Sequence, residues 1–222
     1  MSKRAVRATA GALAAAAWAV HRLARRSGVS PDEARQALPG DDIVSAPNWV
    51  STRALTIAAP PSEVWPWVVQ MGYPTERAGW YTPHWLDELM WGERPRSAET
   101  IRPELQDLKV GDMVPDSPDW TAKYVVEEVE PPSHLVLHST WHVWGPVRSS
   151  DFSWVFALQP VEESLPAGAR RQATRLVVRA RVGYQPKWIY PFVETVIGLG
   201  DWANVSVMLR GIRRRAEAAA SS

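Results

Sequence analysis

Apolar and polar positions alternate along several short runs of the chain, which is the pattern of strands that bury one face. The first run is residues 53–57, with Leu55 and Ile57 on one face. Further strands are predicted at residues 111–115, 122–129, 134–144, 153–158 and 175–182. In the last run we expect one set of side chains to point inward and the other outward: Leu176, Val178, Ala180 and Val182 against Arg175, Val177, Arg179 and Arg181. Successive strands joined by short turns predict an antiparallel sheet.

Apolar positions at helical spacing predict helices before and after these strands. The first follows Pro61 and runs to Gly72, and Pro66 within it is expected to kink or split it. A second short helix is predicted over residues 83–91. The last helix is predicted from Asp201, as its N-cap, to about residue 217, after an apolar, helical stretch at 189–199 and a bend between two glycines, Gly198 and Gly200.

The N-terminal region differs in composition from the rest. Ala8 to Val20 is apolar and Ala-rich between basic residues, but it is shorter than the roughly 20 residues that a membrane span needs. A soluble or membrane-surface helix, a degenerate membrane anchor and a signal peptide all remain open. Ser30 to Glu33 has the form of a capping box and predicts a short helix to about Leu38. We therefore expect four segments: a basic helix with membrane contact at 1–28, a short helix and linker at 29–49, the main domain at 50–217 and a disordered tail at 218–222.

Composition narrows the classes of function. The chain has 222 residues, a net charge of +1 and no cysteine. The charge gives no reason to expect nucleic acid as a partner, and the lack of cysteine excludes disulfides, thiolate metal sites and a cysteine nucleophile. Phosphate-binding glycine loops and nucleophile-elbow patterns are also absent from the sequence. Abundant Arg, Ala and Pro suggest a bacterial gene. We expect a cytoplasmic protein, with association with a membrane as an open alternative.

Three segments resemble the SRPBCC superfamily of helix-grip proteins, which includes START-type lipid-transfer domains and polyketide cyclase/dehydrase-like proteins. They are residues 54–67 (ALTIAAPPSEVWPW), Gly79-Trp80-Tyr81 and residues 103–112 (PELQDLKVGD). The order of elements also agrees from about residue 50 to 217. The resemblance implies an α+β helix-grip fold, in which a curved antiparallel sheet wraps around a long C-terminal helix and two short helices follow the first strand. It also implies a ligand cavity between the sheet and the last helix.

Tryptophan is unusually frequent, with 13 residues, and five of them fall between positions 65 and 91. Such rings either fill a core or line a cavity, because both environments favour large apolar side chains. The candidate ligand-binding residues are Trp65, Trp67, Gln70, Trp80, Tyr81, Trp85, Trp154, Phe156 and Trp202.

The resemblance to polyketide cyclases implies polar groups that steer an enolate, and Tyr81, His84 and Asp87 are the candidates for these roles. His84 and Asp87 are three residues apart and can share a helical face; the alternative is a solvated helix edge.

His134, His138 and His142 share a face of one predicted strand, about 13 Å between neighbouring Cα atoms. This spacing is too wide for one metal ion, so we expect surface or pocket-rim imidazoles, no metal site and no cofactor.

Three functions follow as hypotheses. The first is binding of an apolar small molecule, such as a lipid, an isoprenoid or a polyketide-like ring. The second is a cyclase or dehydratase in the same cavity, which requires at least two polar groups converging inside it. The third is a membrane-surface adaptor that docks through the N-terminal helix. The arginines at 210–215 suit either the solvated end of a helix or contact with anionic lipid.

Overall fold

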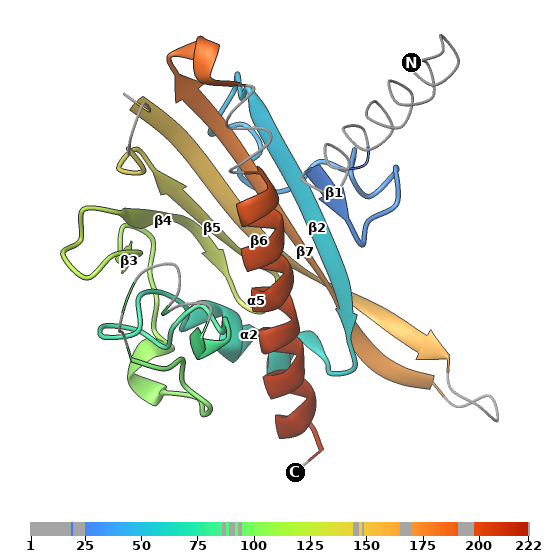
Figure 1. The fold of residues 1–222 in the computed structure, drawn as a ribbon. Helices are drawn as coiled ribbons and strands as arrows, with labels where there is room; N and C mark the ends of the chain where they lie inside the picture. Colours follow the sequence, from blue (N-terminus) through green and yellow to red (C-terminus); the bar gives the residue numbers. More distant parts are fainter. Residues whose placement is uncertain are drawn as a thin grey trace, which may run out of the picture.

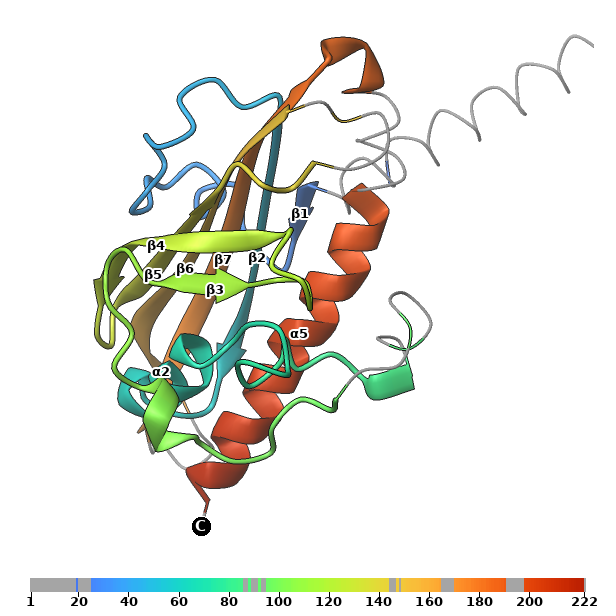
Figure 2. The same ribbon diagram turned by 90° about the vertical axis from the view of Figure 1, so that its left-hand side faces the viewer.

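The computed structural model confirms an α+β fold in which a seven-stranded sheet curves around a C-terminal helix (Figures 1 and 2). The structure describes residues 19, 25–85, 88, 92, 95–143, 147, 149–164, 170–190 and 198–221. The strands are β1 (Arg26–Ser27), β2 (Trp49–Ile57), β3 (Met113–Pro115), β4 (Lys123–Glu130), β5 (His134–Ser139), β6 (Ser149–Ser164) and β7 (Arg170–Gln185). The helices are α2 (Pro61–Val69) and α5 (Gly198–Ala219), with short 3₁₀ turns η1 (Pro103–Leu105) and η3 (Lys187–Ile189).

The sheet order is β1-β2-β7-β6-β5-β4-β3. All pairs are antiparallel except β1 with β2, which is a short parallel pair. The strand β1 was not predicted and lies in the segment expected to be an independent N-terminal helix. β6 and β7 are both 16 residues long, so both extend well beyond their predicted bounds. These two long strands curve along their length (Figure 1).

The inner face of the sheet packs against α5 and α2 to form the main core. The predicted inward set of β7 is confirmed, with Leu176 and Val182 fully buried. On α5 the buried apolar positions follow helical spacing, at Val205, Leu209 and Ile212. α2 runs through Pro66 without a break, so the expected split of this helix is wrong.

The outer face of the sheet is covered as well, by the segment at residues 28–48. A second apolar cluster lies there, formed by Leu38, Ala54, Val136, Val155, Ala157 and Val177. Arg175, Arg179 and Arg181 of β7 do point outward, but they bind this segment. Arg175 pairs with Glu33 at 2.7 Å, and the buried Arg179 pairs with Asp41 at 2.6 Å. The segment is therefore part of the packed domain and not a linker.

The same contacts explain why the predicted helix from Ser30 to Leu38 does not form. Ser30 and Glu33 make both hydrogen bonds of the capping box, at 2.7 and 3.1 Å. However, residues 31–36 adopt turns. The guanidinium of Arg179 donates to the carbonyl oxygens of Glu33, Ala34 and Gln36. These carbonyls therefore accept tertiary hydrogen bonds instead of continuing the backbone hydrogen bonds of a helix.

The start of α5 also differs from the prediction. The helix begins at Gly198 and includes Gly200, so Asp201 lies in its first turn and is not the N-cap. Residues 191–197 lie outside the described part of the chain, as does most of the second short helix predicted at 83–91.

No helix among the described residues combines the length and apolar character needed to cross a bilayer. The Ala-rich run that raised this question lies almost entirely outside the described residues, so the structure leaves its relation to membranes as a prediction.

Candidate binding cavity

A cavity of about 310 Å³ lies between the inner face of the sheet and the first turns of α5. The strand register places it at one end of the sheet, where β2 and β6 begin and β7 ends: Val182 pairs with both Trp49 and Phe152. Its aromatic walls are Trp49, Trp80, Tyr124, Phe152, Trp154 and Tyr184. This volume is at the lower end of the range for small-molecule sites, which are typically lined by aromatic and apolar side chains.

The aromatic walls form one stacked cluster. The ring of Trp154 lies 5.4 Å from that of Trp80 and 5.6 Å from that of Tyr124, and Phe152 meets Tyr124 edge-on at 5.5 Å. Such contacts fix ring orientations. The indole N–H groups of Trp49, Trp80 and Trp154 are buried without a hydrogen-bond partner among the described residues, which is uncommon for buried donors and unfavourable for the fold.

A buried ion pair lies at one wall of the cavity, and Asp201 is the member that lines it. Asp201 on α5 lies 2.6 Å from the guanidinium of Arg53 on β2, and Arg53 also donates to the hydroxyl of Ser51 at 2.8 Å. Burial raises the pKa of Asp201 above its ordinary value, opposed by the charge of Arg53, and burial likewise lowers the pKa of Arg53. Desolvation thus outweighs the mutual attraction, so the cavity wall holds a charge pair that destabilises the fold relative to apolar packing.

The hydroxyls of Tyr124 and Tyr184 make no hydrogen bond to any described residue. Burial raises the pKa of both, and the nearby carboxylate of Asp201 adds to the effect. Both tyrosines therefore stay protonated at neutral pH and can donate a hydrogen bond to a ligand oxygen. Asn204, one turn after Asp201, also lines the cavity with its amide free of described partners.

A histidine and a carboxylate from two loops meet at the rim of the cavity. His142 follows β5 and lies 3.1 Å from Asp116, which follows β3. Its other ring nitrogen lies 2.7 Å from the hydroxyl of Ser139, and its ring stacks on Tyr124 at 4.6 Å. His142 thus ties the two loops together beside the aromatic cluster.

The other two histidines lie elsewhere. His134 pairs with Glu128 on the neighbouring strand, and His138 pairs with Glu127 and Asp151. Because β5 ends at Ser139, His142 is no longer in register with them. Among the described residues, no three potential ligand side chains gather as a metal-binding group.

Two of the predicted ligand-binding residues, Trp80 and Trp154, line this cavity. Phe156 lies directly behind Trp154, at 4.9 Å, and is fully buried in the core. Trp65 is buried in α2 away from the cavity lining, and Trp202 is half-buried beside Asp201. Trp85, expected on an apolar stripe, is 65% exposed.

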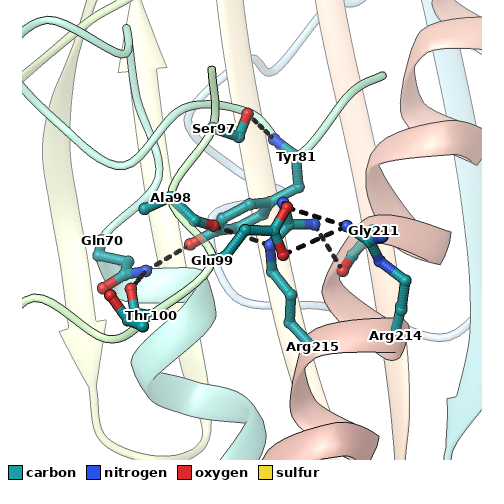
Figure 3. A network of polar contacts seen from close by, with 9 residues as sticks. All are labelled: Gln70, Tyr81, Ser97, Ala98, Glu99, Thr100, Gly211, Arg214 and Arg215. Carbon is teal, nitrogen blue, oxygen red and sulfur yellow. Dashed lines mark hydrogen bonds and ion pairs between the residues drawn. The ribbon is translucent and has the colours of Figure 1, made fainter. Parts of the chain in front are cut away.

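Tyr81 and Gln70 belong instead to a buried network beside α5 (Figure 3), and the backbone of Trp67 contacts this network. Gln70 donates to the hydroxyl of Tyr81 at 2.8 Å, and that hydroxyl donates to the carbonyl of Trp67 at 2.9 Å. The ring of Tyr81 lies 4.7 Å from the guanidinium of Arg215, and burial raises the pKa of Tyr81. These side chains are committed to internal contacts and hold the fold.

His84 does not join a catalytic group in the aromatic cavity. It pairs with Glu88 at 3.1 Å and lines a separate surface pocket. Asp87 lies outside the described residues. The structure therefore does not bring the three predicted catalytic candidates together within the cavity.

The residues that sequence reasoning missed could in part have been found by extending strand parity. Trp49 continues the face of Leu55 and Ile57, Phe152 that of Trp154, and Tyr184 that of Val182. The contribution of Asp116 comes from a loop and carries no such pattern. His142, expected as a surface or pocket-rim imidazole on a strand, lines the cavity from the loop after β5.

Comparison with known proteins identifies no family for this chain. No family model matches the chain, and no curated protein matches it. A solved structure of a Mesorhizobium loti protein is 18% identical, covers 75% of this chain and 96% of its own, and has a TM-score of 0.42. Proteins from Nitrosomonas europaea (14%, 78% and 97%, TM-score 0.45) and Chromobacterium violaceum (13%, 76% and 96%, TM-score 0.44) are similar to the same degree. At these levels of similarity, nothing about the site follows.

Proposed function

We propose that this chain is a helix-grip protein of the SRPBCC type that binds a compact apolar molecule with at least one ring in the aromatic cavity. The observation that carries the proposal is the stacked cluster around Trp154, which surrounds a cavity of about 310 Å³ with aromatic faces. That volume suits a ring system better than a long-chain lipid, since ligand pockets commonly reach about 1,000 Å³. The free hydroxyls of Tyr124 and Tyr184 suit a ligand with an oxygen acceptor.

The test has two parts. Native mass spectrometry of the protein purified from its own host, with organic extraction, identifies any molecule that travels with it. In parallel, calorimetric titration with 2-naphthol measures whether a small aromatic alcohol binds. We expect saturable binding that is lost in Asn204→Trp, because the larger side chain fills the cavity from α5.

Ser206→Trp is the matched control, since Ser206 lies on the same helix and lines a different pocket. It should bind 2-naphthol like the wild type. If 2-naphthol and a panel of larger ring compounds fail to bind, and no molecule co-purifies, the binding proposal is wrong.

A second candidate function is a cyclase or dehydratase acting in the same cavity. It is supported by His142, Asp116 and Tyr184, which all line the cavity and are groups able to hold and move protons. Once a ligand is identified, its conversion by the wild type and not by His142→Ala would support this activity, while recovery of the ligand unchanged would leave binding alone.

A further inference from the structure

A second pocket, of about 320 Å³, lies on the surface beside the buried network of Figure 3. One wall is the face of α5 that carries Val207, Arg210 and Arg214, and the opposite walls are residues 81–84 and 96–99. The aromatic cavity lies further towards the N-terminal end of the same helix. Successive residues Trp80 and Tyr81 line the two sites, Trp80 the aromatic cavity and Tyr81 the surface pocket.

The floor of this pocket is rigid. A Cβ atom on Gly211 would come within 2.2 Å of the carbonyl oxygen of Tyr81, so the chain at Tyr81 lies directly on the helix. Tyr81 has a positive φ of 59°, and its backbone N–H donates to Ser97 at 3.0 Å. Arg215, which is buried, donates to the carbonyl of Ala98 at 2.8 Å and to Glu99 at 2.6 Å. These contacts fix the pocket walls relative to one another.

The pocket has more positive charge than its own carboxylate can neutralise. Of the residues that the structure describes, four arginines line it, together with one carboxylate, Glu99. Arg214 and Arg215 both pair with Glu99, as Figure 3 shows. Arg96 and Arg210 are exposed and have no ion-pair partner among the described residues.

The arrangement of these cations is unfavourable without an anion. Arg210 and Arg214 are four residues apart on α5, a spacing at which like charges repel. The charge of Arg214 also contributes to lowering the pKa of Arg215, after the larger effect of burial. His84, at the other wall, has its Nδ1 atom buried without a partner among the described residues.

We propose that this pocket binds a phosphate group. Guanidinium groups recognise phosphate oxygens through paired, charge-assisted hydrogen bonds, and Arg is favoured wherever such planar recognition is required. Arg96 and Arg210 approach from different walls and supply the free donors, while Arg214 and Arg215 remain with Glu99. The group belongs either to a soluble phosphate ester or to the headgroup of an anionic lipid. The proposal does not depend on what occupies the aromatic cavity.

The test is calorimetric titration of the full chain with inorganic pyrophosphate at low ionic strength, where surface charges are least screened. We expect saturable binding at one site and a rise in thermal midpoint on binding, because the anion relieves the repulsion. The double substitution Arg96→Gln/Arg210→Gln should raise the dissociation constant by at least about tenfold. Neither side chain has a described partner, so the fold should be unchanged.

The matched control is Arg213→Gln/Lys187→Gln, which removes the same total charge from exposed positions outside the pocket. Its affinity should fall much less than that of the pocket variant, since neither side chain lines the pocket and a charge further from the anion attracts it more weakly. Absence of saturable pyrophosphate binding, or an equal loss in both variants, would overturn the proposal, because the latter result means diffuse attraction.

Vesicles of phosphatidylcholine, with and without phosphatidic acid, distinguish the two sources of phosphate. Cosedimentation that requires phosphatidic acid, and that the pocket substitutions abolish, assigns the site to a lipid headgroup. Pyrophosphate binding without cosedimentation assigns it to a soluble phosphate ester. Cosedimentation that survives the pocket substitutions, combined with no pyrophosphate binding, excludes a phosphate site here.

Discussion

Replacing Asp201 by alanine removes the carboxylate that faces the buried guanidinium of Arg53 at 2.6 Å. The side chain of Arg53 is only 2% exposed, so its charge loses its closest counter-charge in a place that water barely reaches. Removing one member of a buried pair typically lowers the free energy of unfolding by about 3–5 kcal/mol. The side chain of Asp201 is 19% exposed and the hydroxyl of Ser51 remains as an acceptor, which places the expected loss near the lower end, about 3 kcal/mol.

The double substitution Arg53→Met/Asp201→Leu separates the effect of charge from that of packing. Both variants replace the same contact between β2 and α5, but the double variant leaves no buried charge. Because desolvation dominates the pKa shifts of both partners, we expect the double variant to lie within about 1 kcal/mol of the wild type. The loss for Asp201→Ala corresponds to a fall of about 6–12 °C in thermal midpoint for a chain of this size.

Urea unfolding followed by tryptophan fluorescence measures these changes, and an unchanged dependence on urea concentration shows that the unfolding reaction is the same. The reasoning fails if Asp201→Ala loses less than about 1 kcal/mol, a loss typical of an ordinary hydrogen bond. It also fails if the double variant loses as much stability as the single variants Arg53→Met and Asp201→Leu added together, since the two charges would then be independent.

Three further predictions concern the fold. Gly211→Ala should lower the free energy of unfolding by at least about 2 kcal/mol in urea, because its Cβ would overlap the carbonyl of Tyr81. Gly200→Ala is the control: its Cβ has nothing within 4 Å, so the substitution should be neutral or slightly stabilising. Equal effects of the two substitutions would contradict the close approach at Gly211. Arg179→Ala should lower the free energy of unfolding by about 2–4 kcal/mol and speed proteolysis of residues 28–48, because several backbone carbonyls lose a buried donor. The control, Arg170→Ala, removes one member of an exposed ion pair and should change stability by less than about 0.5 kcal/mol. Stability should fall as pH rises above about 10, because burial raises the pKa of Tyr81, Tyr124 and Tyr184 in the folded chain while the unfolded chain ionises them. Absorbance at 295 nm showing all five tyrosines ionised in the folded protein near pH 10.5 would refute this.

The fold could be predicted where residues repeat at the period of their own element. The alternation of β7 and the apolar stripe of α5 both specify a buried face by local spacing alone. The strand β1 could not be predicted because it depends on pairing with β2. The turns at residues 31–36 could not be predicted because they depend on contacts with Arg179, more than 100 residues away. A capping box signals a helix start, but tertiary hydrogen bonds to the following carbonyls prevented its extension.

The candidate site was predicted in part for a related reason. Trp80 and Trp154 were found because tryptophan is conspicuous, yet the same criterion selected Trp85, which is exposed. Ring size indicates where apolar surface is available and does not indicate which volume it borders. Asp201 was assigned to helix capping because capping is local, whereas its actual partner lies on β2 and only the packing of α5 brings the two together.

The cover over the outer face of the sheet changes where the smallest independently folding unit begins. A fragment starting at residue 50 would have the whole set of elements predicted for the helix-grip domain, yet it would expose apolar side chains such as Val155 and Val177 along with the neighbouring arginines of β7. Long strands with an uncovered apolar side associate with one another. Shortening the chain from its N-terminus to residue 49 is therefore expected to make the sheet associate with other copies of itself, even though every residue that lines the aromatic cavity would still be present.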